Sequence, residues 1–388
     1  MTRGQPNMII ENQALRTFAR AEINTVILLS GEAQDTGAHC PERLGHQIRF
    51  VSLNLPFDQA LDSSLWRAVA AAPSRTRAGP NRIFPVRQVR LVKRGTGPDR
   101  GSFASGKWGG KYLRAPEIYW LLLERYPDRL VRLGQVAGVR RGITTGANDF
   151  FFLSGQEAAE HGIEPEFLVP AIKHPQQCPR VWLDPERDTS QYLFLCHRDR
   201  EELDGTGALR YIAHGESMGI DQRPTCQARR RWWDLGARAG ALLCCNYLVD
   251  EVIRFYVSSR PMFVGDNFQE LHTELEPSLL AVACNSTVCQ LFANVQGRSS
   301  FGGGLLKLQS YEVRDLWIPD PRLLGAELNQ MLAPMGLLAL ESEDRLILDE
   351  IVFDKLGLTS SEQDAVREAV TRMVYSRLGK ANSLRSSI

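Results

Sequence analysis

The chain has 388 residues, enough for two or three domains, and its 43% hydrophobic and 23% charged residues are typical of a soluble globular protein. Its 46 Lys and Arg residues balance 45 Asp and Glu residues, which leaves a net charge of +1. The whole chain therefore exerts no strong attraction on nucleic acid, and any nucleic-acid site must be a local basic patch.

Three further features narrow the class of protein. No apolar run approaches the roughly 20 residues that a membrane-spanning helix needs, so we expect no membrane partner. The opening residues MTRGQPN do not resemble a signal peptide. The eight cysteines lack a regular spacing, which indicates reduced thiols and a cytoplasmic location.

The first part of the chain carries apolar runs at residues 8–11, 21–29 and 47–53. Such apolar strands usually lie inside a sheet that is covered on both faces, and 21–29 is predicted to be a buried strand. A sheet cannot begin with its interior strands, so we expect further strands from later in this chain or from another chain. Residues 57–78 have a helical pattern that ends at Pro73.

A basic segment with Gly and Pro at residues 74–82 is interpreted as a linker and a domain boundary. After it, residues 83–92 alternate as one or two strands. Residues 93–111 are rich in Gly, Ser and basic residues and are predicted to form an exposed loop. Residues 114–126 carry an apolar stripe with Pro116 near the first turn, which predicts a helix.

Residues 133–153, LGQVAGVRRGITTGANDFFFL, concentrate polar chemistry between two apolar runs. The pattern predicts two strands around a tight connection. That connection would present two guanidinium groups, two hydroxyls and an amide at one end of a sheet. The alternative is an ordinary glycine-rich hairpin.

The second half of the chain alternates between strands and helices. The predicted strands lie in 164–173, 181–183 and 192–196, and 242–249 is expected to pair with 251–257. Residues 208–215 and 279–295 are predicted to be helical, and 311–319 extended. Residues 345–378 are predicted to form two helices joined at 357–361, with Thr359 or Ser360 as the N-cap of the second.

The densest basic and aromatic cluster is RPTCQARRRWW at residues 223–233. Guanidinium groups neutralise phosphates, and tryptophan offers a stacking face for a base. The alternative is a solvated face with two core tryptophans. The glycine turn at 302–304, flanked by Arg298 and Lys307, allows close backbone approach to a ligand but lacks the pattern of a phosphate-binding loop.

Neither a metal site nor a catalytic triad is recognisable in the sequence. The cysteines and histidines have no spacing suited to a metal, so we expect no metal and interpret the thiols as structural. The tetrapeptide at residues 54–57, Asn-Leu-Pro-Phe, resembles the Asn-x-Pro-aromatic loop of adenine-N6 methyltransferases. Only 53 residues precede it, too few for the cofactor-binding segment, so we interpret the match as a coincidence.

Several segments, in family order, resemble the C-terminal part of a TaqI-like, adenine-specific DNA methyltransferase of restriction–modification type. Residues 9–29 are similar to the last strands of its catalytic domain, through the pattern of Phe18, Ala21, Ile23, Asn24 and Thr25. GVRRGITTGANDFFFL resembles the entry to its target recognition domain, and YIAHGESMGIDQRPTCQARRRWW resembles the middle. CNSTVCQLFANVQGRSSFGGGLLKL and LDEIVFDKLGLTSSE are similar to later family segments.

This resemblance implies an α/β (α+β) fold. A partial edge of a methyltransferase sheet (residues 1–78) would lead through a basic linker with one helix (79–130) to a mixed α/β target recognition domain (131–325) and a C-terminal pair of helices (326–388). The family uses S-adenosylmethionine. The glycine motif and the Asn-Pro-Pro-aromatic catalytic loop lie upstream of residue 9 in such enzymes, so we expect no cofactor site and assign no catalytic residue here.

The partner that the resemblance implies is double-stranded DNA, and phosphate contacts would dominate its affinity. Our first hypothesis is a truncated, inactive DNA-reading part. The second is a half-enzyme that is active with a chain carrying the missing N-terminal half, and the third is a gene remnant. The residues predicted to contact DNA are Arg140, Arg141, Thr144, Thr145, Asn148, Arg223, Arg229, Arg230, Arg231, Trp232, Arg298 and Lys307.

Overall fold

A computed structural model describes residues 4–14, 25–32, 45–60, 62–95, 108–299 and 304–382 of the chain. The chain divides into two compact units. Unit 1 comprises Met1–Arg125, Leu291–Lys307 and Asp364–Ile388, and unit 2 comprises Tyr126–Gln290 and Leu308–Gln363. Phe18, Ala21, Ile23 and Asn24 of the family-like pattern lie outside the described residues, as do two of the three glycines at 302–304.

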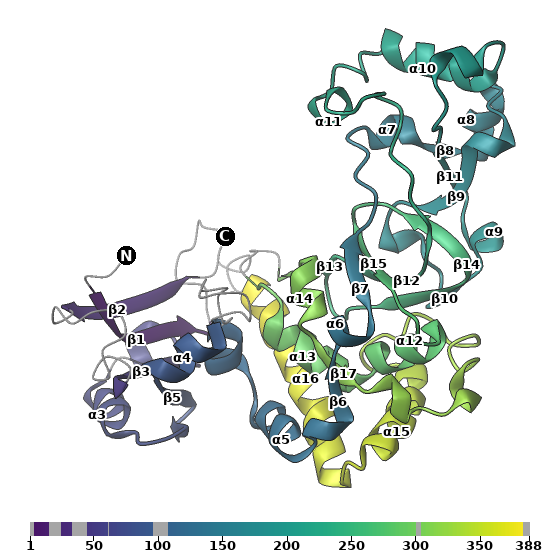
Figure 1. The fold of residues 1–388 in the computed structure, drawn as a ribbon. Helices are drawn as coiled ribbons and strands as arrows, with labels where there is room; N and C mark the ends of the chain where they lie inside the picture. The colour runs from purple at the N-terminus through teal and green to yellow at the C-terminus, as the bar shows by residue number, and fades with distance from the viewer. Residues whose placement is uncertain are drawn as a thin grey trace. The chain divides into compact units, whose positions relative to one another are not determined.

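Unit 1 contains a five-stranded sheet in the order β2-β1-β3-β5-β4. Strands β1 and β3 are parallel, and the other neighbours are antiparallel. Apolar side chains of β1, β3 and β5 pack against Leu65 and Val69 of α3 (Ser63–Ala71). The strands, purple to blue in Figure 1, are β1 (Gly4–Asn12), β2 (Val26–Glu32), β3 (Gln47–Leu53), β4 (Thr76–Ala78) and β5 (Asn81–Arg87).

The prediction of a buried strand at 21–29 is wrong for its described part. Strand β2 lies at the edge of the sheet, and β1 is its only neighbour among the described strands. Val26, Ile27, Leu28 and Leu29 are 52%, 38%, 58% and 46% exposed. An apolar run specifies a strand, but burial depends on which elements come to cover it, and none of the described ones covers β2.

The predicted helix at 57–78 is broken, and the predicted boundary at residue 78 is misplaced. Helix α2 (Phe57–Ala60) and helix α3 are separate, and the carboxylate of Asp62 caps α3 by accepting a hydrogen bond from the Leu65 amide at 2.7 Å. Residues 76–87 form the β4–β5 hairpin, and β5 pairs along β3. Residues 79–87 therefore belong to the sheet of unit 1 and are not a linker.

The segment predicted as an exposed loop at 93–111 is folded at both ends, while residues 96–107 lie outside the described residues. Helix α4 (Gln88–Gly95) precedes the gap, and a π-helical turn, η1 (Gly109–Arg114), follows it. A Cβ on Gly110 would lie 1.9 Å from the carbonyl oxygen of Val295, so glycine is required there. The helix predicted at 114–126 is confirmed as α5 (Glu117–Arg125).

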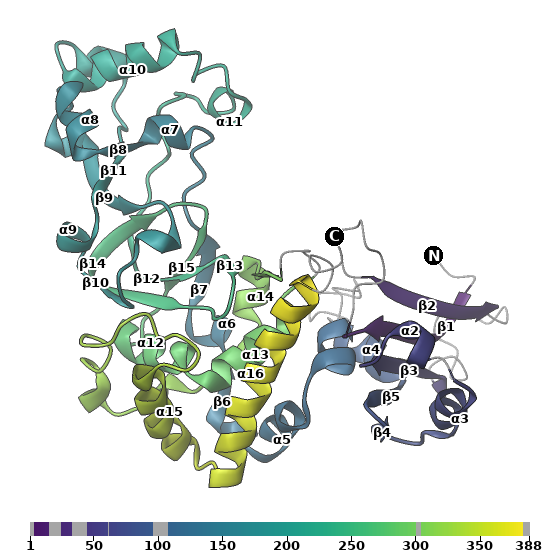
Figure 2. The ribbon, with the colours of Figure 1, turned by 180° about the vertical axis from the view of Figure 1, so that it is seen from behind.

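Unit 2 is built on a second sheet, in the order β7-β15-β12-β14-β9-β11-β8, with β10 paired to β14. Helices α10 (Gly207–Ser217) and α11 (Pro224–Gln227) gather with α7 (Asn148–Phe151) and α8 (Gly155–Glu160) at one end of this unit. Helices α12 (Pro277–Asn285) and α15 (Glu343–Leu356) lie at the other end (Figures 1 and 2). The strands are β7 (Gly138–Arg141), β8 (Phe152–Ser154), β9 (Leu168–Ile172), β10 (Trp182–Leu183), β11 (Gln191–Phe194), β12 (Ala241–Asn246), β14 (Phe255–Val264) and β15 (Phe268–His272).

The predicted pair of strands within 133–153 is wrong in its pairing. Strand β7 pairs with β15 and β8 pairs with β11, so the two strands lie at opposite edges of the sheet. Between them, the amides of Gly142 and Ile143 donate to the carbonyls of Phe268 and Val264 at 3.0 and 2.8 Å. A Cβ on Gly142 would meet the Gly265 carbonyl oxygen at 2.1 Å. The glycine is needed for this close passage across the sheet, not for a hairpin.

The helix predicted at 279–295 is interrupted at Ser286, between α12 (Pro277–Asn285) and α13 (Thr287–Gln296). The buried carboxylate of Asp349 accepts a hydrogen bond from the Thr287 amide at 2.7 Å and one from its hydroxyl, which begins a new helix at this point. Among the described helices, no single one is long and apolar enough to cross a membrane; α12 and α13 meet that criterion only jointly, across a bend.

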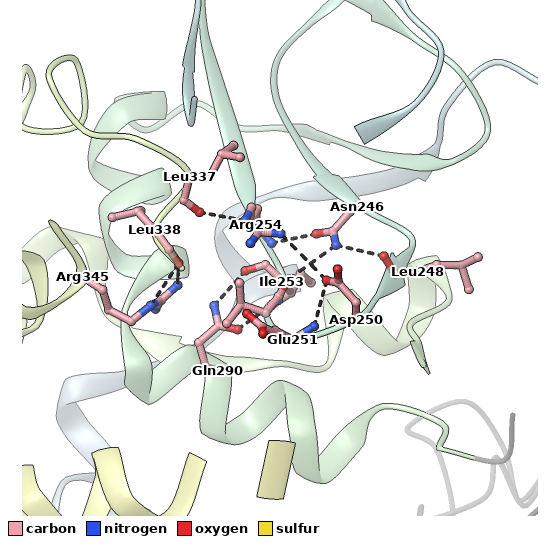
Figure 3. Close-up of polar contacts among 11 residues, drawn as sticks. Asn246, Leu248, Asp250, Glu251, Ile253, Arg254, Gln290, Leu337, Leu338 and Arg345 are labelled. Carbon is pink, nitrogen blue, oxygen red and sulfur yellow. Dashed lines mark hydrogen bonds and ion pairs between the residues drawn. The ribbon is translucent and has the colours of Figure 1, made fainter. Parts of the chain in front are cut away.

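A buried polar network holds the connection between β12 and β14 in place (Figure 3). The Asn246 side chain donates to the Leu248 carbonyl at 2.9 Å and accepts from the Arg254 amide at 2.7 Å. The fully buried Gln290 accepts from the Ile253 amide at 3.0 Å and donates to the Ile253 carbonyl at 2.8 Å. These side chains satisfy backbone groups that have no partner strand at this bend.

The two predicted C-terminal helices are confirmed as α15 (Glu343–Leu356) and α16 (Ser360–Asn382), and Thr359 caps the second in a reciprocal pair of bonds with Glu362. The predicted extended segment at 311–319 is half wrong, because its first half belongs to α14. The remaining elements are η2 (Pro127–Arg129), β6 (Leu130–Arg132), α6 (Leu133–Val136), α7 (Asn148–Phe151), α8 (Gly155–Glu160), η3 (Pro165–Phe167), η4 (Pro175–Gln177), α9 (Pro185–Asp188), η5 (Arg200–Leu203), β13 (Leu248–Val249), β16 (Leu306–Lys307), α14 (Ser310–Arg314), β17 (Trp317–Pro319), η6 (Pro321–Leu323) and η7 (Ala326–Leu328).

Candidate nucleic-acid interface

Two stretches that the sequence analysis singled out lie against each other in unit 2. The guanidinium of Arg229 donates to the backbone carbonyls of Thr144 and Thr145 at 3.1 and 2.7 Å, and to that of Trp232 at 3.2 Å. The Cζ atom of its guanidinium lies 5.6 Å from the centre of the Phe151 ring. Arg229 therefore fastens the loop at 142–147 to the arginine-rich turn at 229–233, and we call this arrangement the arginine clamp.

The polar side chains of the loop are used partly to shape it. Thr145 is buried; its hydroxyl accepts from the Ala147 amide at 3.1 Å and donates to the side chain of Asn148, the first residue of α7. Gly146 has a φ of +79°, and a Cβ there would meet Thr225 at 2.4 Å. Thr144 is the exposed hydroxyl of this loop.

Trp232 occupies a core position, as in the alternative of two core tryptophans. Its ring is 9% exposed and packs 5.0 Å from the Phe150 ring, and its Nε1 donates to Glu216 at 3.2 Å. Trp233 is buried as well. Because Trp232 is buried in the core, its ring offers no stacking surface to a base, contrary to its prediction as a DNA contact.

The arginines of the clamp region differ in how their charges are compensated. Arg231 is tied to Asp199 and Asp234. Arg223 makes a two-pronged pair with the exposed Asp149, at 2.6 and 2.7 Å, and these hydrogen bonds hold the pKa of Asp149 below its usual value. Arg230 is exposed and makes no hydrogen bond or ion pair with any residue that the structure describes. Among Arg223, Arg229, Arg230 and Arg231 it is the one that is exposed.

Arg140 and Arg141 lie on β7 and are held by carboxylates. Arg140 donates to the fully buried Glu270 at 2.6 Å, and Arg238 donates to the same carboxylate oxygen at 3.1 Å. Arg141 pairs with Asp266 at 3.4 Å and lies 4.8 Å from the centre of the Tyr247 ring. The guanidinium groups of Arg140 and Arg141 remain about half exposed, with 42% and 46% of their side chains accessible.

Arg298 and Lys307 belong to unit 1, whereas the other predicted contact residues belong to unit 2. They form an isolated antiparallel β-bridge, in which the backbone amide of each residue donates to the carbonyl of the other, at 3.0 and 3.1 Å. The family resemblance led us to predict that these two residues and the arginines at 223–231 contact the same DNA. The sequence analysis did not predict Glu270 and Asp149 as parts of the site. Their roles depend on arginine partners that the fold brings next to them.

The thiols and the family-like tetrapeptide take structural roles. The seven cysteines among the described residues are buried and free, and burial raises the pKa of the Cys178 thiol to about 12, so it stays protonated at neutral pH. The Asn54 side chain donates to the Pro80 carbonyl at 2.9 Å, and Phe57 packs against the core of unit 1. Within the described ranges no three His, Cys, Asp or Glu side chains converge on a point suited to a metal ion.

Comparison with known proteins identifies the family. The profile of the C-terminal domain of type II methyltransferase M.Eco57I matches residues 105–348, well over half of the chain. The chain belongs to the M.Eco57I C-terminal domain family. The matched range contains the arginine clamp, β7 and most of unit 2. The predicted resemblance to the C-terminal part of a restriction–modification DNA methyltransferase is thereby confirmed.

Curated relatives of this family member are longer than the chain. Type II methyltransferase M.AccI of Acinetobacter calcoaceticus is 24% identical over an alignment 231 residues long, which covers 55% of this chain and 42% of the relative. Type II methyltransferase M.XamI of Xanthomonas campestris pv. amaranthicola is 25% identical over an alignment 210 residues long, which covers 50% of this chain and 37% of the relative. The chain therefore matches less than half the length of each.

A solved structure supports the fold. The type IIG restriction endonuclease BpuSI superimposes with a TM-score of 0.52 at 13% identity, over 98% of this chain and 44% of that one. At this identity the likeness concerns the fold alone. It confirms the predicted mixed α/β architecture, because the similarity extends over almost the whole of this M.Eco57I C-terminal domain family member.

Proposed function

We propose that this chain is the DNA-reading part of an adenine-specific, S-adenosylmethionine-dependent DNA methyltransferase and is inactive without further polypeptide. Family membership and the names of its relatives support the enzyme class. The observation that carries the DNA-reading role is the arginine clamp, with exposed Arg230 and Thr144 beside half-exposed Arg223. Guanidinium groups held on a braced loop suit a phosphate backbone.

The geometry divides the proposed contact residues into two roles. Arg230, Thr144, Arg223, Arg140 and Arg141 would reach DNA, because their side chains are at least partly exposed. Arg229, Arg231, Thr145 and Asn148 would position the loop, because their polar atoms are engaged within the protein. Arg298 and Lys307 in unit 1 stay as further proposed contacts.

The purified chain is expected to bind duplex DNA with an affinity that falls steeply with salt. Each phosphate contact releases counterions and adds about 0.9 to the slope of log affinity against log salt. Fluorescence anisotropy with a labelled duplex at several salt concentrations measures that slope. In a second experiment, calorimetry measures whether the chain binds S-adenosylmethionine. An affinity for DNA that does not change with salt, or micromolar binding of S-adenosylmethionine, would contradict the proposal.

A second candidate function is that of a half-enzyme that works with a chain carrying the cofactor site and catalytic loop. The exposed apolar residues 26–29 of β2 favour it, because an uncovered edge strand is a template for pairing with another chain. The occupant would be a strand of the catalytic sheet of a type II methyltransferase.

Leu28→Lys is expected to abolish association with such a catalytic chain while leaving binding to duplex DNA unchanged, because Leu28 is the most exposed of the four apolar residues. Transfer of labelled methyl groups to DNA by the mixed chains is the measurement. Leu323→Lys, at an exposed leucine in unit 2, is the matched control and should keep full activity. Equal methylation by both variants would exclude β2 as the contact.

A further inference from the structure

Unit 1 contains a cavity of about 400 Å³, partly open to solvent, that the proposed DNA-reading role does not use. Because β1 and β3 are parallel, their carboxyl ends meet at one edge of the sheet, where Glu11 and Asn54 border this cavity. Arg114 at the end of η1 contributes to another wall, as do residues 365–380 of α16. All of the residues that line the cavity belong to unit 1.

Positive charge predominates in the cavity. Six basic side chains and three carboxylates line it, although the chain as a whole has a net charge of only +1. Two of the carboxylates already have basic partners, since Glu117 pairs with Arg75 and Glu368 with Arg372. The basic residues are Arg77, Arg82, Arg114, Arg372, Arg377 and Lys380.

Two of these guanidinium groups donate to neutral oxygens and keep their charge uncompensated by a direct ion pair. Arg82 donates to the Leu113 carbonyl at 2.9 Å, and burial lowers the pKa of its guanidinium to about 10, which leaves it charged at neutral pH. Arg114 donates to the Gly297 carbonyl at 3.3 Å and to the Ser299 hydroxyl. Its buried Nε has no hydrogen-bond partner among the described residues.

The chemistry of the lining distinguishes between classes of ligand. S-adenosylmethionine carries a sulfonium and an ammonium group against a single carboxylate, so it is a net cation, and this basic lining suits an anion better than that cofactor. A phosphate would accept hydrogen bonds from donors that Arg82 and Arg114 do not use within the protein, because guanidinium groups bind phosphate through paired N–H donors. Glu11, which is only 6% exposed, could accept a hydrogen bond from a base amine or a sugar hydroxyl. The volume falls in the range of small-ligand pockets, about 300–1,000 Å³.

We propose that this cavity binds the phosphate of a nucleoside monophosphate unit, with Arg82 and Arg114 as its principal ligands. The unit comes either from a free nucleotide or from a single strand of nucleic acid, since both present the same phosphate and base. This site lies outside unit 2, so the inference stands independently of the arginine clamp.

Calorimetry on the full chain with dAMP, inorganic phosphate and a short oligodeoxyadenylate tests the proposal. Arg114→Gln should weaken binding about tenfold, the loss expected for one charge-assisted hydrogen bond. Arg77→Gln, at an exposed lining residue, should also weaken binding and cannot perturb the core. Arg67→Gln, on the exposed face of α3 outside the cavity, is the matched control and should bind as the unaltered chain does.

Binding of dAMP would identify a free nucleotide as the source, and binding of the oligonucleotide alone, weakened by Arg114→Gln, would identify a strand. The proposal would be overturned if neither dAMP nor the oligonucleotide bound, or if Arg114→Gln and Arg77→Gln bound as tightly as the unaltered chain does. Binding of S-adenosylmethionine that competes with dAMP would also overturn it. Replacement of Arg223 and Arg230 in unit 2 should leave dAMP binding unchanged, which separates failure of this site from failure of the DNA-reading proposal.

Discussion

Replacing Gln290 by alanine is expected to lower the free energy of unfolding by about 3 kcal/mol, because a buried donor and a buried acceptor each lose their partner. The fully buried side-chain amide of Gln290 accepts a hydrogen bond from the Ile253 amide at 3.0 Å and donates one to the Ile253 carbonyl at 2.8 Å (Figure 3). The methylenes removed with it leave a cavity that adds to the loss. Urea denaturation followed by tryptophan fluorescence measures the change.

Gln330→Ala is the matched control for this prediction. Gln330 lies in the same unit, is exposed, and makes no side-chain hydrogen bond with the described residues. The same chemical change should therefore shift the free energy of unfolding by no more than about 0.5 kcal/mol. Similar losses for the two variants would mean that the network of Figure 3 contributes little to stability.

The double substitution Arg223→Ala with Arg230→Ala is expected to weaken binding of duplex DNA by an order of magnitude or more and to reduce the salt slope by about two. Each guanidinium would neutralise one phosphate, so its loss removes the counterion release of that contact. The exposed pair between Arg223 and Asp149 contributes at most about 1 kcal/mol to stability, so the variant should stay folded. Anisotropy titrations at several salt concentrations measure both effects.

Two further variants distinguish arginines that contact DNA from an arginine that positions the loop. Arg187→Ala removes another exposed arginine of unit 2, on α9, and should leave affinity and slope unchanged. Arg229→Ala removes three hydrogen bonds from the clamp, so it should weaken DNA binding together with thermal stability. If the double variant kept the original salt slope, Arg223 and Arg230 would not contact phosphate and the clamp would have a purely structural role.

Features governed by neighbours in the sequence could be predicted. The helix that follows Pro116 and the cap between Thr359 and Glu362 depend on residues three or four positions apart, so their patterns are visible in a single chain. The strands β11 and β12 and the helix α10 are likewise placed by apolar spacing. The family-like segments also kept their order along the chain, and the family assignment followed from them.

Features governed by distant partners could not be predicted. The two strands within 133–153 were predicted to flank a tight connection because they are close in sequence. Instead β7 pairs with a strand about 130 positions away and β8 with one about 40 positions away, at opposite edges of the sheet. The helix at 279–295 was predicted to be continuous because the carboxylate of Asp349, which begins α13, comes from a helix 62 positions further on.

The basic residues show the same division between sequence and tertiary structure. The amino-acid sequence by itself determined that arginines would cluster at 140–141 and 223–231 and that the chain is a methyltransferase relative. Only the tertiary structure decided that Arg229 braces a loop, that Arg231 is neutralised by carboxylates, and that Arg230 is free to meet a ligand. The physical reason is that a guanidinium takes its role from the acceptors around it, and folding brings those acceptors from remote parts of the chain.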